Sequence, residues 1–334
     1  MLKRRRIFIA VPKGSRLLNG EVDRAIEVFW KLKGNSREEF QKISIIPGKI
    51  GCLKLARITR SSSVSIVVSV LLSSQSFCLS PLADRNKKIA IHSIASDPSL
   101  IKGMKHNFRM IHKDDDQGRG AAIFVKKHLK LYRGVLIFES SHRYGSIISK
   151  SFRETFTNLG GKLNVVIKFP GDESFLKNLT KHLREDPQFV FLSSSPKAAV
   201  KLIETLAKHG FKGVLFLSDW ASLNLKPPLP IRDVYFTTEY IQGHHETEVS
   251  SAFERLYIEL FNRPPHFTTA LIFDSLLAAH EALQSSEDPE EYLKRTRIDG
   301  VCGTFGFKED GEVDKGVLIA KLEKAPNFAG KVIL

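Results

Sequence analysis

The segment from Gly134 to Phe175 constrains the fold more strongly than any other part of the sequence. An apolar run, Val135 to Phe138, is followed by a polar turn and then by apolar residues at helical spacing from Ile147 to Phe156. Two glycines end that helix, and a second apolar run, Leu163 to Phe169, comes after them. Strand, turn, helix and strand in this order predict a right-handed crossover between parallel strands. The turn after the first strand then lies at the carboxyl edge of the sheet, where open α/β folds bind ligands.

The same alternation of apolar runs and helical segments extends through most of the chain. Further strands are expected at Ile7–Val11, Ile43–Ile46, Val64–Leu72, Lys88–His92, Gln188–Leu192, Val214–Leu217 and Val234–Thr238. Further helices are expected at Glu21–Leu32, Gly51–Arg60, Ser76–Arg85, Ala121–Lys130, Pro196–His209, Glu248–Phe261 and Thr269–Leu283. The stretch up to about Lys113 is interpreted as irregular, and Val301–Phe307 with Val317–Leu322 as a hairpin. The pattern predicts an α/β fold with two doubly wound, Rossmann-like lobes.

Length and composition fit a soluble protein of two domains. The chain has 334 residues, of which 42% are hydrophobic and 26% charged, and such a length is more natural for two cores than for one. The longest apolar run, Val64 to Leu72, is far shorter than the roughly 20 residues of a membrane span. Lys3 to Arg6 resemble the start of a signal peptide, but the apolar run behind them is too short for one. No export signal is therefore predicted within this sequence.

The chain carries a formal net charge of +15. Such an excess suggests nucleic acid or an anionic surface as a partner. The basic residues are spread through the expected helices, for example Lys126, Lys127 and Lys130, and aromatic residues are not interleaved with them. A solvated basic surface is therefore expected, and no nucleic-acid partner.

The sequence gives little support to metal binding or catalysis. Cys52, Cys78 and Cys302 lack CxxC spacing; a Cys52–Cys78 bridge stays open as an alternative, although free thiols are favoured. The adjacent histidines at 244 and 245 are interpreted as solvated, and Pro12 to Arg16 has too few glycines for a phosphate loop. No catalytic elbow, zinc helix or Walker motif occurs. We expect no enzyme, no cofactor and no metal.

Several short motifs together resemble the type I periplasmic binding proteins, in the group of receptors for leucine, isoleucine and valine. They are Arg143-Tyr144-Gly145, the turn Phe169–Phe175, Asn262–Pro265, and Gly300–Gly303 with Phe307–Gly311. The resemblance extends from about Lys88 to Leu322 and is thinner before it, where the loop Pro12 to Leu17 is shorter than usual. It implies lobe 1 at residues 5–112 plus 239–312, lobe 2 at 113–238 plus 313–334, and a ligand cleft between them.

The resemblance also assigns binding residues to the first lobe. Ser73 and Ser74 match the loop that binds the α-carboxylate of the ligand, and a helix N-terminus offers free amide donors to such an anion. Ile94, through its backbone carbonyl, and Ser96, through its hydroxyl, match the next strand end. The alternative for Ser73 and Ser74 is simple helix capping, and for Ser96 ordinary turn chemistry.

In the second lobe the resemblance points to three residues. Tyr144 would cover the ligand, Asp219 would bind its α-ammonium, and Trp220 would line the pocket. The alternatives are that Tyr144 packs on the hinge and that Asp219 is an exposed turn residue.

Three functions are consistent with these residues. The first is an extracytoplasmic receptor that closes over an amino acid or a similar small polar molecule and docks with the permease of an ABC-type transporter. The second is an interaction protein like the penicillin-binding-protein activators, with a degenerate cleft and a cell-wall synthase as partner, because Tyr144–Gly161 and Gly300–Leu322 resemble those as well. The third is a cytoplasmic amide or amino-acid sensor. The receptor is the function we expect.

Overall fold

The structure is a computed structural model, and it describes residues 6–34, 40–170, 179–181, 183, 186–223, 225, 229–231 and 233–334. Residues 171–175 of the turn used for the family resemblance, and residues 3–5 of the basic N-terminus, lie outside the described residues.

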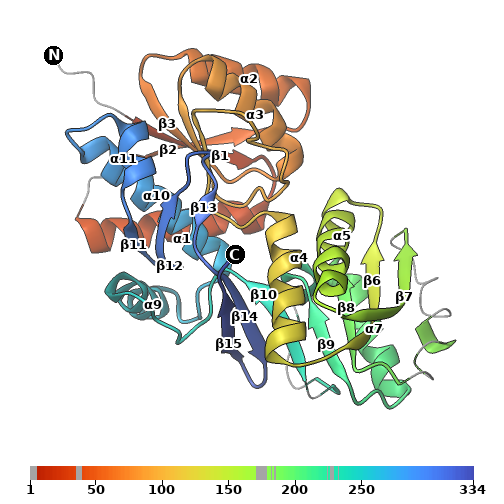
Figure 1. The fold of residues 1–334 in the computed structure, drawn as a ribbon. Coiled ribbons are helices and arrows are strands. Elements are labelled where there is room, and N and C mark those ends of the chain that lie inside the picture. The colour runs from red at the N-terminus through yellow and green to blue at the C-terminus, as the bar shows by residue number, and fades with distance from the viewer. Residues whose placement is uncertain are drawn as a thin grey trace. The chain divides into compact units, whose positions relative to one another are not determined.

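The chain divides into two compact units (Figure 1). Unit 1 comprises Met1–His112 and Gln242–Lys315, and unit 2 comprises Lys113–Ile241 and Gly316–Leu334. The chain therefore passes from one unit to the other three times. The predicted α/β fold with two doubly wound lobes is confirmed. No helix among the described residues is long and apolar enough to cross a bilayer.

Unit 1 is built on a parallel sheet of order β2-β1-β3-β4-β5. Its strands are β1 (Arg6–Pro12), β2 (Phe40–Ile45), β3 (Val64–Ser69), β4 (Ile89–His92) and β5 (Asn107–Arg109). Its helices are α1 (Arg16–Lys33), α2 (Lys49–Arg60), α3 (Ser73–Arg85), α9 (Glu248–Phe261), α10 (Phe267–Gln284) and α11 (Pro289–Arg295). A small antiparallel sheet joins β11 (Ile298–Gly300), β12 (Gly303–Phe307) and β13 (Val313–Asp314).

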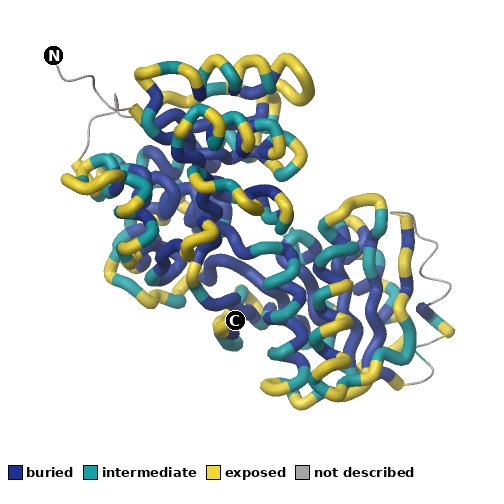
Figure 2. The backbone as a smooth tube through the Cα atoms, turned by 45° about the horizontal axis from the view of Figure 1, so that its top comes forward, coloured by how far each residue is buried: buried dark blue, intermediate teal, exposed yellow. Residues whose placement is uncertain are grey.

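The central strands of unit 1 are apolar almost without interruption because helices cover both faces of the sheet. Helices α1 and α10 contact β1 and β3, while α2 and α3 contact β3 and β4. The dark blue strand segments inside the yellow and teal helices of Figure 2 show this burial. Helix α1 begins where Ser15 accepts a hydrogen bond from the Leu18 amide, and it ends at Gly34, whose φ of 66° suits glycine.

Unit 2 contains a seven-stranded sheet of order β15-β14-β10-β9-β8-β6-β7. Its strands are β6 (Arg133–Glu139), β7 (Lys162–Phe169), β8 (Phe189–Ser193), β9 (Val214–Leu217), β10 (Val234–Thr238), β14 (Val317–Leu322) and β15 (Pro326–Val332). Its helices are α4 (Asp114–Ile123) with the π-helical turn η2 (Phe124–His128), α5 (Arg143–Asn158), α7 (Pro196–Lys208) and α8 (Asp219–Ser222). Strands β7, β6, β8, β9 and β10 are parallel, as the crossover pattern predicts.

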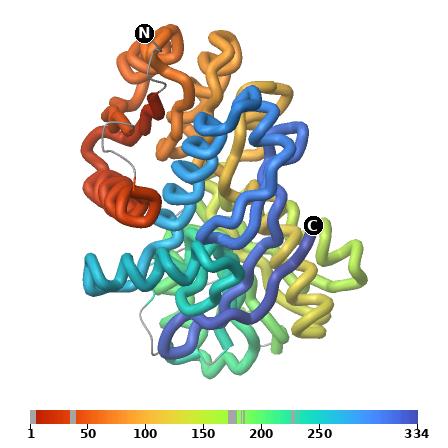
Figure 3. Tube along the Cα trace, turned by 90° about the vertical axis from the view of Figure 1, so that its left-hand side faces the viewer, coloured from red at the N-terminus to blue at the C-terminus, as the bar shows by residue number. Residues whose placement is uncertain are grey.

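The hairpin predicted for Val301–Phe307 and Val317–Leu322 is wrong. Strand β12 pairs with β11 and β13 in unit 1, whereas β14 pairs with β10 and β15 in unit 2. Strands β14 and β15 run side by side as the dark blue segment of Figure 3. Two apolar runs separated by a glycine-containing turn look like a hairpin in sequence, but here a chain crossing between the units separates them.

Some elements were absent from the sequence interpretation. The stretch before Lys113 contains β5, and α4 begins at Asp114, well before the expected Ala121. Three aspartates occupy the first turn of α4, where their negative charges stabilise the positive end of the helix dipole. The helix therefore begins before the apolar residues that predicted it. Strand β15 was missed because its residues are mostly polar or half-exposed.

The preference for free thiols at Cys52 and Cys78 is also wrong. These two cysteines form a disulfide that joins α2 to α3, with their Cα atoms 5.7 Å apart. Cys302 is a buried thiol outside this disulfide.

Candidate functional site

The candidate residues of unit 2 follow the carboxyl ends of two parallel strands of one sheet, β6 and β9, which flank β8. Tyr144 is the second residue of α5, which follows β6, and Asp219 begins α8, directly after β9. Strands β6 and β8 are neighbours, although β7 lies between them in sequence, so the direction of winding reverses there. This is the topological switch point at which open α/β sheets bind ligands.

A glycine lets α5 approach the sheet closely enough to bring Tyr144 to the strand ends. A Cβ atom on Gly145 would lie 2.3 Å from the carbonyl oxygen of Glu139, the last residue of β6. Any larger residue would push the start of α5 away from the sheet. In the motif Arg143-Tyr144-Gly145, the position after the tyrosine therefore requires glycine for steric reasons.

Tyr144 and Asp219 are bonded directly to each other. The Tyr144 hydroxyl donates a hydrogen bond to Asp219 Oδ1. The backbone amide of Trp220 donates to the same Oδ1 at 2.6 Å and approaches the Tyr144 hydroxyl at 3.2 Å. The alternative in which Asp219 is an exposed turn residue is excluded, because only 7% of its surface is accessible.

A second chain of hydrogen bonds reaches the other oxygen of Asp219. Gln117 on α4 donates from Nε2 to Asp219 Oδ2 at 3.2 Å, and Thr237 on β10 donates to Gln117 Oε1 at 3.1 Å. A carboxylate has about four lone-pair positions, and the described residues supply two donors to Oδ1 and one to Oδ2. Asp219 Oδ2 therefore has capacity for one further donor.

The electrostatic environment of this pair is unusual. Burial is the main cause that raises the pKa of Asp219 to about 6; the carboxylate of Glu239 raises it as well, while the hydrogen bonds from Tyr144 and the Trp220 amide oppose the rise. Burial and the adjacent Asp219 charge hold the pKa of Tyr144 well above its usual value. At neutral pH the pair is thus a buried carboxylate bonded to a neutral phenol, and a further positive group would stabilise it.

Aromatic rings adjoin the carboxylate. The Trp220 ring meets the Tyr144 ring edge to face with centroids 5.5 Å apart, and the His142 ring lies at the same distance from Trp220 at 68°. The structure thus brings together the three residues that the sequence pointed to in unit 2. Rings in this arrangement offer an apolar wall beside a charge.

In unit 1, Ser73 and Ser74 are the first two residues of α3, after β3. The Ser73 hydroxyl does not cap the helix; it accepts a hydrogen bond from the Asp97 amide at 3.3 Å. Among the described residues, no acceptor contacts the backbone amides of Ser73 and Ser74. Gln75 Nε2, on the same turn, is buried and lacks a partner there too. This turn therefore has spare donors for an anion.

Ile94 and Ser96 lie in the loop after β4, and both are half-buried. The loop is held at two points. Ser93 Oγ donates to Ser275 Oγ at 2.9 Å, and Asp97 Oδ1 accepts bonds from the amide and hydroxyl of Ser99. The Ser73–Asp97 bond links this loop to the start of α3, so the four predicted residues of unit 1 lie on two joined segments.

Several polar residues near the Asp219 carboxylate were missed. Gln117 lies on the part of α4 between the stretch expected to be irregular and the expected helix, and Glu239 directly follows β10. Glu139, which ends β6, is also buried and accepts a hydrogen bond from the Ser195 amide at 2.8 Å. The signal that could have found the two glutamates is the one that found Asp219, a polar residue directly after an apolar strand.

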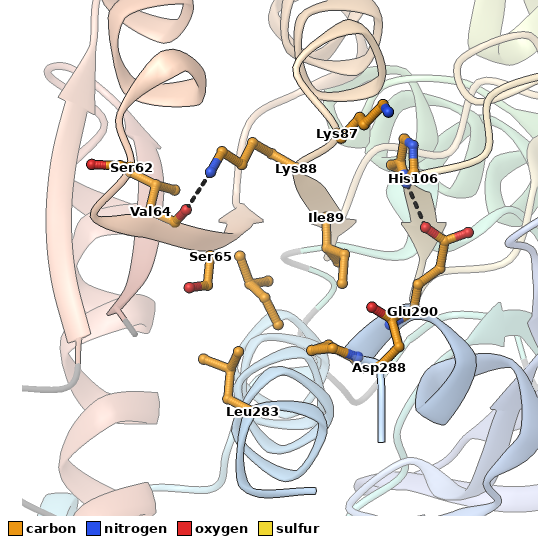
Figure 4. Close-up of a pocket in the computed structure, with 12 residues that line it drawn as sticks. Ser62, Val64, Ser65, Lys87, Lys88, Ile89, His106, Leu283, Asp288 and Glu290 are labelled. Carbon is orange, nitrogen blue, oxygen red and sulfur yellow. Dashed lines mark hydrogen bonds and ion pairs between the residues drawn. The ribbon is translucent and has the colours of Figure 1, made fainter. Parts of the chain in front are cut away.

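A hollow lies at the amino ends of the strands in the unit 1 sheet, opposite to the strand ends that precede Ser73 and Ile94. It encloses about 520 Å³ near the starts of β3 and β4 and the end of α10 (Figure 4). Some of its polar groups are engaged: Lys88 Nζ donates to the Val64 carbonyl at 2.8 Å, and His106 bonds to Glu290. None of the residues singled out in the sequence lines it.

Groups of three or more side chains able to hold a metal do not occur among the described residues. His244 bonds to Glu246 at 3.2 Å, and His245 Nδ1 lies 3.3 Å from Ser250 Oγ. The histidine pair therefore takes part in local contacts at the start of α9.

Comparison with known proteins gives a family and a set of similar structures. The model of the periplasmic binding protein family matches residues 54–327. No curated protein matches the sequence.

Solved structures match the whole chain at low identity. The leucine-binding protein LivK from Thermotoga maritima is 20% identical, with 98% of each chain covered and a TM-score of 0.80. LivJ from Streptococcus pneumoniae, in complex with isoleucine, is 18% identical, with 99% of each chain covered and a TM-score of 0.79. A solute-binding protein from R. palustris, in complex with benzoate, is 14% identical, with 98% of this chain and 96% of that chain covered and a TM-score of 0.78. These structures share the fold of this chain.

Proposed function

Since this chain belongs to the periplasmic binding protein family, we propose that it is a solute receptor for an ABC-type transporter and that its ligand is an amino acid or a close analogue. The ligand carries an ammonium group and a carboxylate. Asp219 binds the ammonium, and the first turn of α3 binds the carboxylate. The protein acts by binding and not by catalysis.

The buried Asp219 carboxylate is the observation that carries this proposal. It is ionised at neutral pH although it is removed from water, and one position on Oδ2 is left for a donor. An ammonium group supplies both the positive charge and the donor. Among the structural relatives, one binds isoleucine and another benzoate. Benzoate has no ammonium group, so a buried aspartate favours the amino-acid class here.

The first turn of α3 supports the other half of the proposal. The free amides of Ser73 and Ser74 and the buried Nε2 of Gln75 offer donors without acceptors among the described residues. Such a set suits a carboxylate. Ile94, Ser96, Tyr144 and Trp220 complete the proposed set of ligand-binding residues.

The cysteine chemistry supports a location outside the cytoplasm, which is also what the family implies. Disulfides persist in oxidising compartments and are rare in the cytosol, and Cys52 and Cys78 are bridged. This favours the receptor over a cytoplasmic sensor.

A thermal-shift screen of the purified protein tests the proposal. The panel contains free amino acids, amino-acid amides, peptidoglycan peptides and benzoate. A ligand at 100 times its Kd adds about 2.7 kcal/mol to the free energy of unfolding, which raises Tm by several degrees. We expect at least one amino acid to produce this rise and benzoate to produce none.

Two variants and one control locate the site. Asp219→Asn keeps acceptors for the Tyr144 hydroxyl and the Trp220 amide but loses the charge, so it should fold and lose the ligand-induced rise, as should Asp219→Ala. Asp233→Ala removes an aspartate of the same unit that forms an ion pair with Lys321 at 2.9 Å, and it should keep the rise. A rise that survives in both Asp219 variants, or one produced by benzoate alone, would contradict the proposal.

A further inference from the structure

The segment between Glu39 and Asp84 contains no acidic residue at all. It contains five cations, Lys42, Lys49, Lys54, Arg57 and Arg60, and it forms β2, α2, β3 and most of α3. A protein with a net charge of +15 has a basic surface on average. In this segment of unit 1, however, the positive charges are not interspersed with negative ones. Four of the five cations lie on α2.

The exposed face of α2 combines these cations with large aliphatic side chains. Ile50 and Leu53 are 66% and 63% exposed, whereas Gly51, Leu55 and Thr59 are buried. At about 100° per residue, the two aliphatic side chains lie in the middle of the outward face. The cations on that face are all exposed: Lys49, Lys54, Arg57 and Arg60.

The cations of α2 are not neutralised within the described part of the protein. No ion pair there involves Lys49, Lys54, Arg57 or Arg60, whereas Lys42 is paired with Asp23. Lys54 Nζ donates to the Ser44 carbonyl at 2.9 Å, which leaves its charge without a carboxylate. The positive charge of this face is therefore available to a partner.

The neighbouring helix α3 carries a further exposed apolar side chain. Phe77 on α3 is 41% exposed, and the residue after it, Cys78, is tied to α2 through the disulfide with Cys52. The bridge fixes α2 and α3 to each other. The surface formed by Ile50, Leu53 and the four α2 cations is called the α2 face below.

We propose that the α2 face binds an anionic phospholipid surface. Helices that lie on membranes place aliphatic or aromatic side chains among Lys and Arg residues, and each cation near an anionic leaflet contributes favourably to binding. The aliphatic side chains protrude from the outward face of a helix, where they can enter the headgroup region. Protruding aliphatic side chains surrounded by cations suit a bilayer, which offers an apolar interior beneath a layer of negative charge, and lipid is therefore the occupant we argue for. This inference is independent of the proposed amino-acid site.

Helix α7 in unit 2 provides an internal control. It has 13 residues against 12 for α2, and its exposed positions include Lys197, Val200 and Lys208. However, Glu204 lies on that face as well, and Val200 is only 41% exposed. Substitutions that remove two positive charges and one exposed aliphatic side chain can thus be made on α7 as well, which lacks the features of the α2 face.

Cosedimentation of the purified protein with lipid vesicles tests the proposal. Vesicles of pure phosphatidylcholine are compared with vesicles that also contain phosphatidylglycerol. One variant combines Lys49→Gln, Leu53→Ser and Arg57→Gln, and the control combines Lys197→Gln, Val200→Ser and Lys208→Gln. Both remove two positive charges and one exposed aliphatic side chain. None of these residues is buried, and the amino-acid thermal shift should persist in both variants.

The wild-type protein should bind the anionic vesicles and not the neutral ones. Since each cation near the surface contributes about a fivefold factor, the α2 variant should lose roughly 25-fold in binding constant from its two charges and more from the lost leucine, while the α7 control should change by less than about twofold. Equal loss in both variants would overturn the proposal, because binding would then follow net charge alone. Failure to bind anionic vesicles, together with binding to polyglutamate, would overturn it in favour of an acidic protein partner.

Discussion

Asp219 carries a negative charge where water cannot stabilise it, so its protonation should control ligand affinity. Its pKa is raised to about 6, and only the ionised form attracts an ammonium group. Affinity should be constant between about pH 7 and pH 8 and should fall as the pH drops below 6, by up to tenfold per pH unit. Calorimetric titration of the bound amino acid from pH 8 to pH 5 measures this dependence.

Tyr144→Phe is the matched variant for that titration. The Tyr144 hydroxyl bonds to Asp219 and lowers its pKa, so removing the hydroxyl should move the loss of affinity to a higher pH. The aromatic contact with Trp220 is kept, since only an oxygen is removed. A pH profile identical to that of the wild type would contradict the assignment of the profile to Asp219.

Asp274 allows a test of stability that does not depend on ligand. It is buried on α10, and its two oxygens accept hydrogen bonds from the Val301 and Cys302 amides at 2.6 and 2.9 Å. Burial raises its pKa to about 6 from 3.8. The folded state therefore binds more protons than the unfolded state between these values, and the contribution of Asp274 to stability increases as the pH falls from 6 to 4.

The wild type should gain about 2 kcal/mol relative to Asp274→Asn when the pH is lowered from 7 to 4. Urea unfolding of both proteins at the two pH values measures the difference. Asp299→Asn, at an exposed position in the nearby strand β11, is the control for the loss of one carboxylate at the surface. A constant difference between wild type and Asp274→Asn would show that Asp274 has the same proton affinity in both states.

The residues that could be predicted from sequence share one property. Tyr144 and Asp219 come soon after apolar strands, and the ends of parallel strands meet at one edge of a sheet. Gln117 could not be predicted, because it reaches Asp219 from a helix that is distant in sequence and whose start the apolar pattern did not reveal. The pairing of Tyr144 with Asp219 depends on side-chain direction, which strand order alone does not give.

At the scale of elements, the disulfide between α2 and α3 should stabilise unit 1. The cysteines are 26 residues apart, and closing a loop of this length in the unfolded chain corresponds to about 3.5 kcal/mol in the chain-entropy model. Adding a reductant should therefore lower the urea midpoint of the wild type. A variant with Cys52→Ser and Cys78→Ser should already be less stable and should not respond to the reductant.

Thiol counting provides a separate check of the bridge. The unfolded wild type should bind one alkylating group without reductant, at Cys302, and three after reduction. Three labels without reductant would show that the bridge is absent. The sequence left this pairing open because α2 and α3 pack against each other only in the folded unit.

The elements themselves were predictable where their apolar pattern is regular. Strand β6, helix α5 and strand β7 follow the expected crossover, since consecutive parallel elements must return to the same sheet. The pairing of β12 and β14 was not predictable from the same rule. Their apolar runs predict that both are strands. The choice of pairing partner, however, depends on where the chain crosses between the units, and the local sequence does not indicate this.

At the scale of the whole molecule, each unit has its own core and sheet, and the chain passes between them three times. Under the proposed function, Ser73 in unit 1 and Asp219 in unit 2 contribute to one binding site. A ligand that contacts both units would couple their free energies of unfolding, because it makes all of its contacts only when both units are folded.

A double-mutant cycle tests whether one ligand uses both units. Ser73→Ala and Asp219→Asn should each weaken binding of the same amino acid, and the two losses should not add, because a ligand released at one end shifts at the other. Calorimetric Kd values of the wild type, both single variants and the double variant give the interaction energy. Ser74→Ala, an exposed neighbour whose amide stays in place, is the control for Ser73→Ala and should change Kd less. If Ser73→Ala has no effect while Asp219→Asn abolishes binding, the ligand does not use the Ser73 hydroxyl, and the assignment of that hydroxyl to the carboxylate site is wrong.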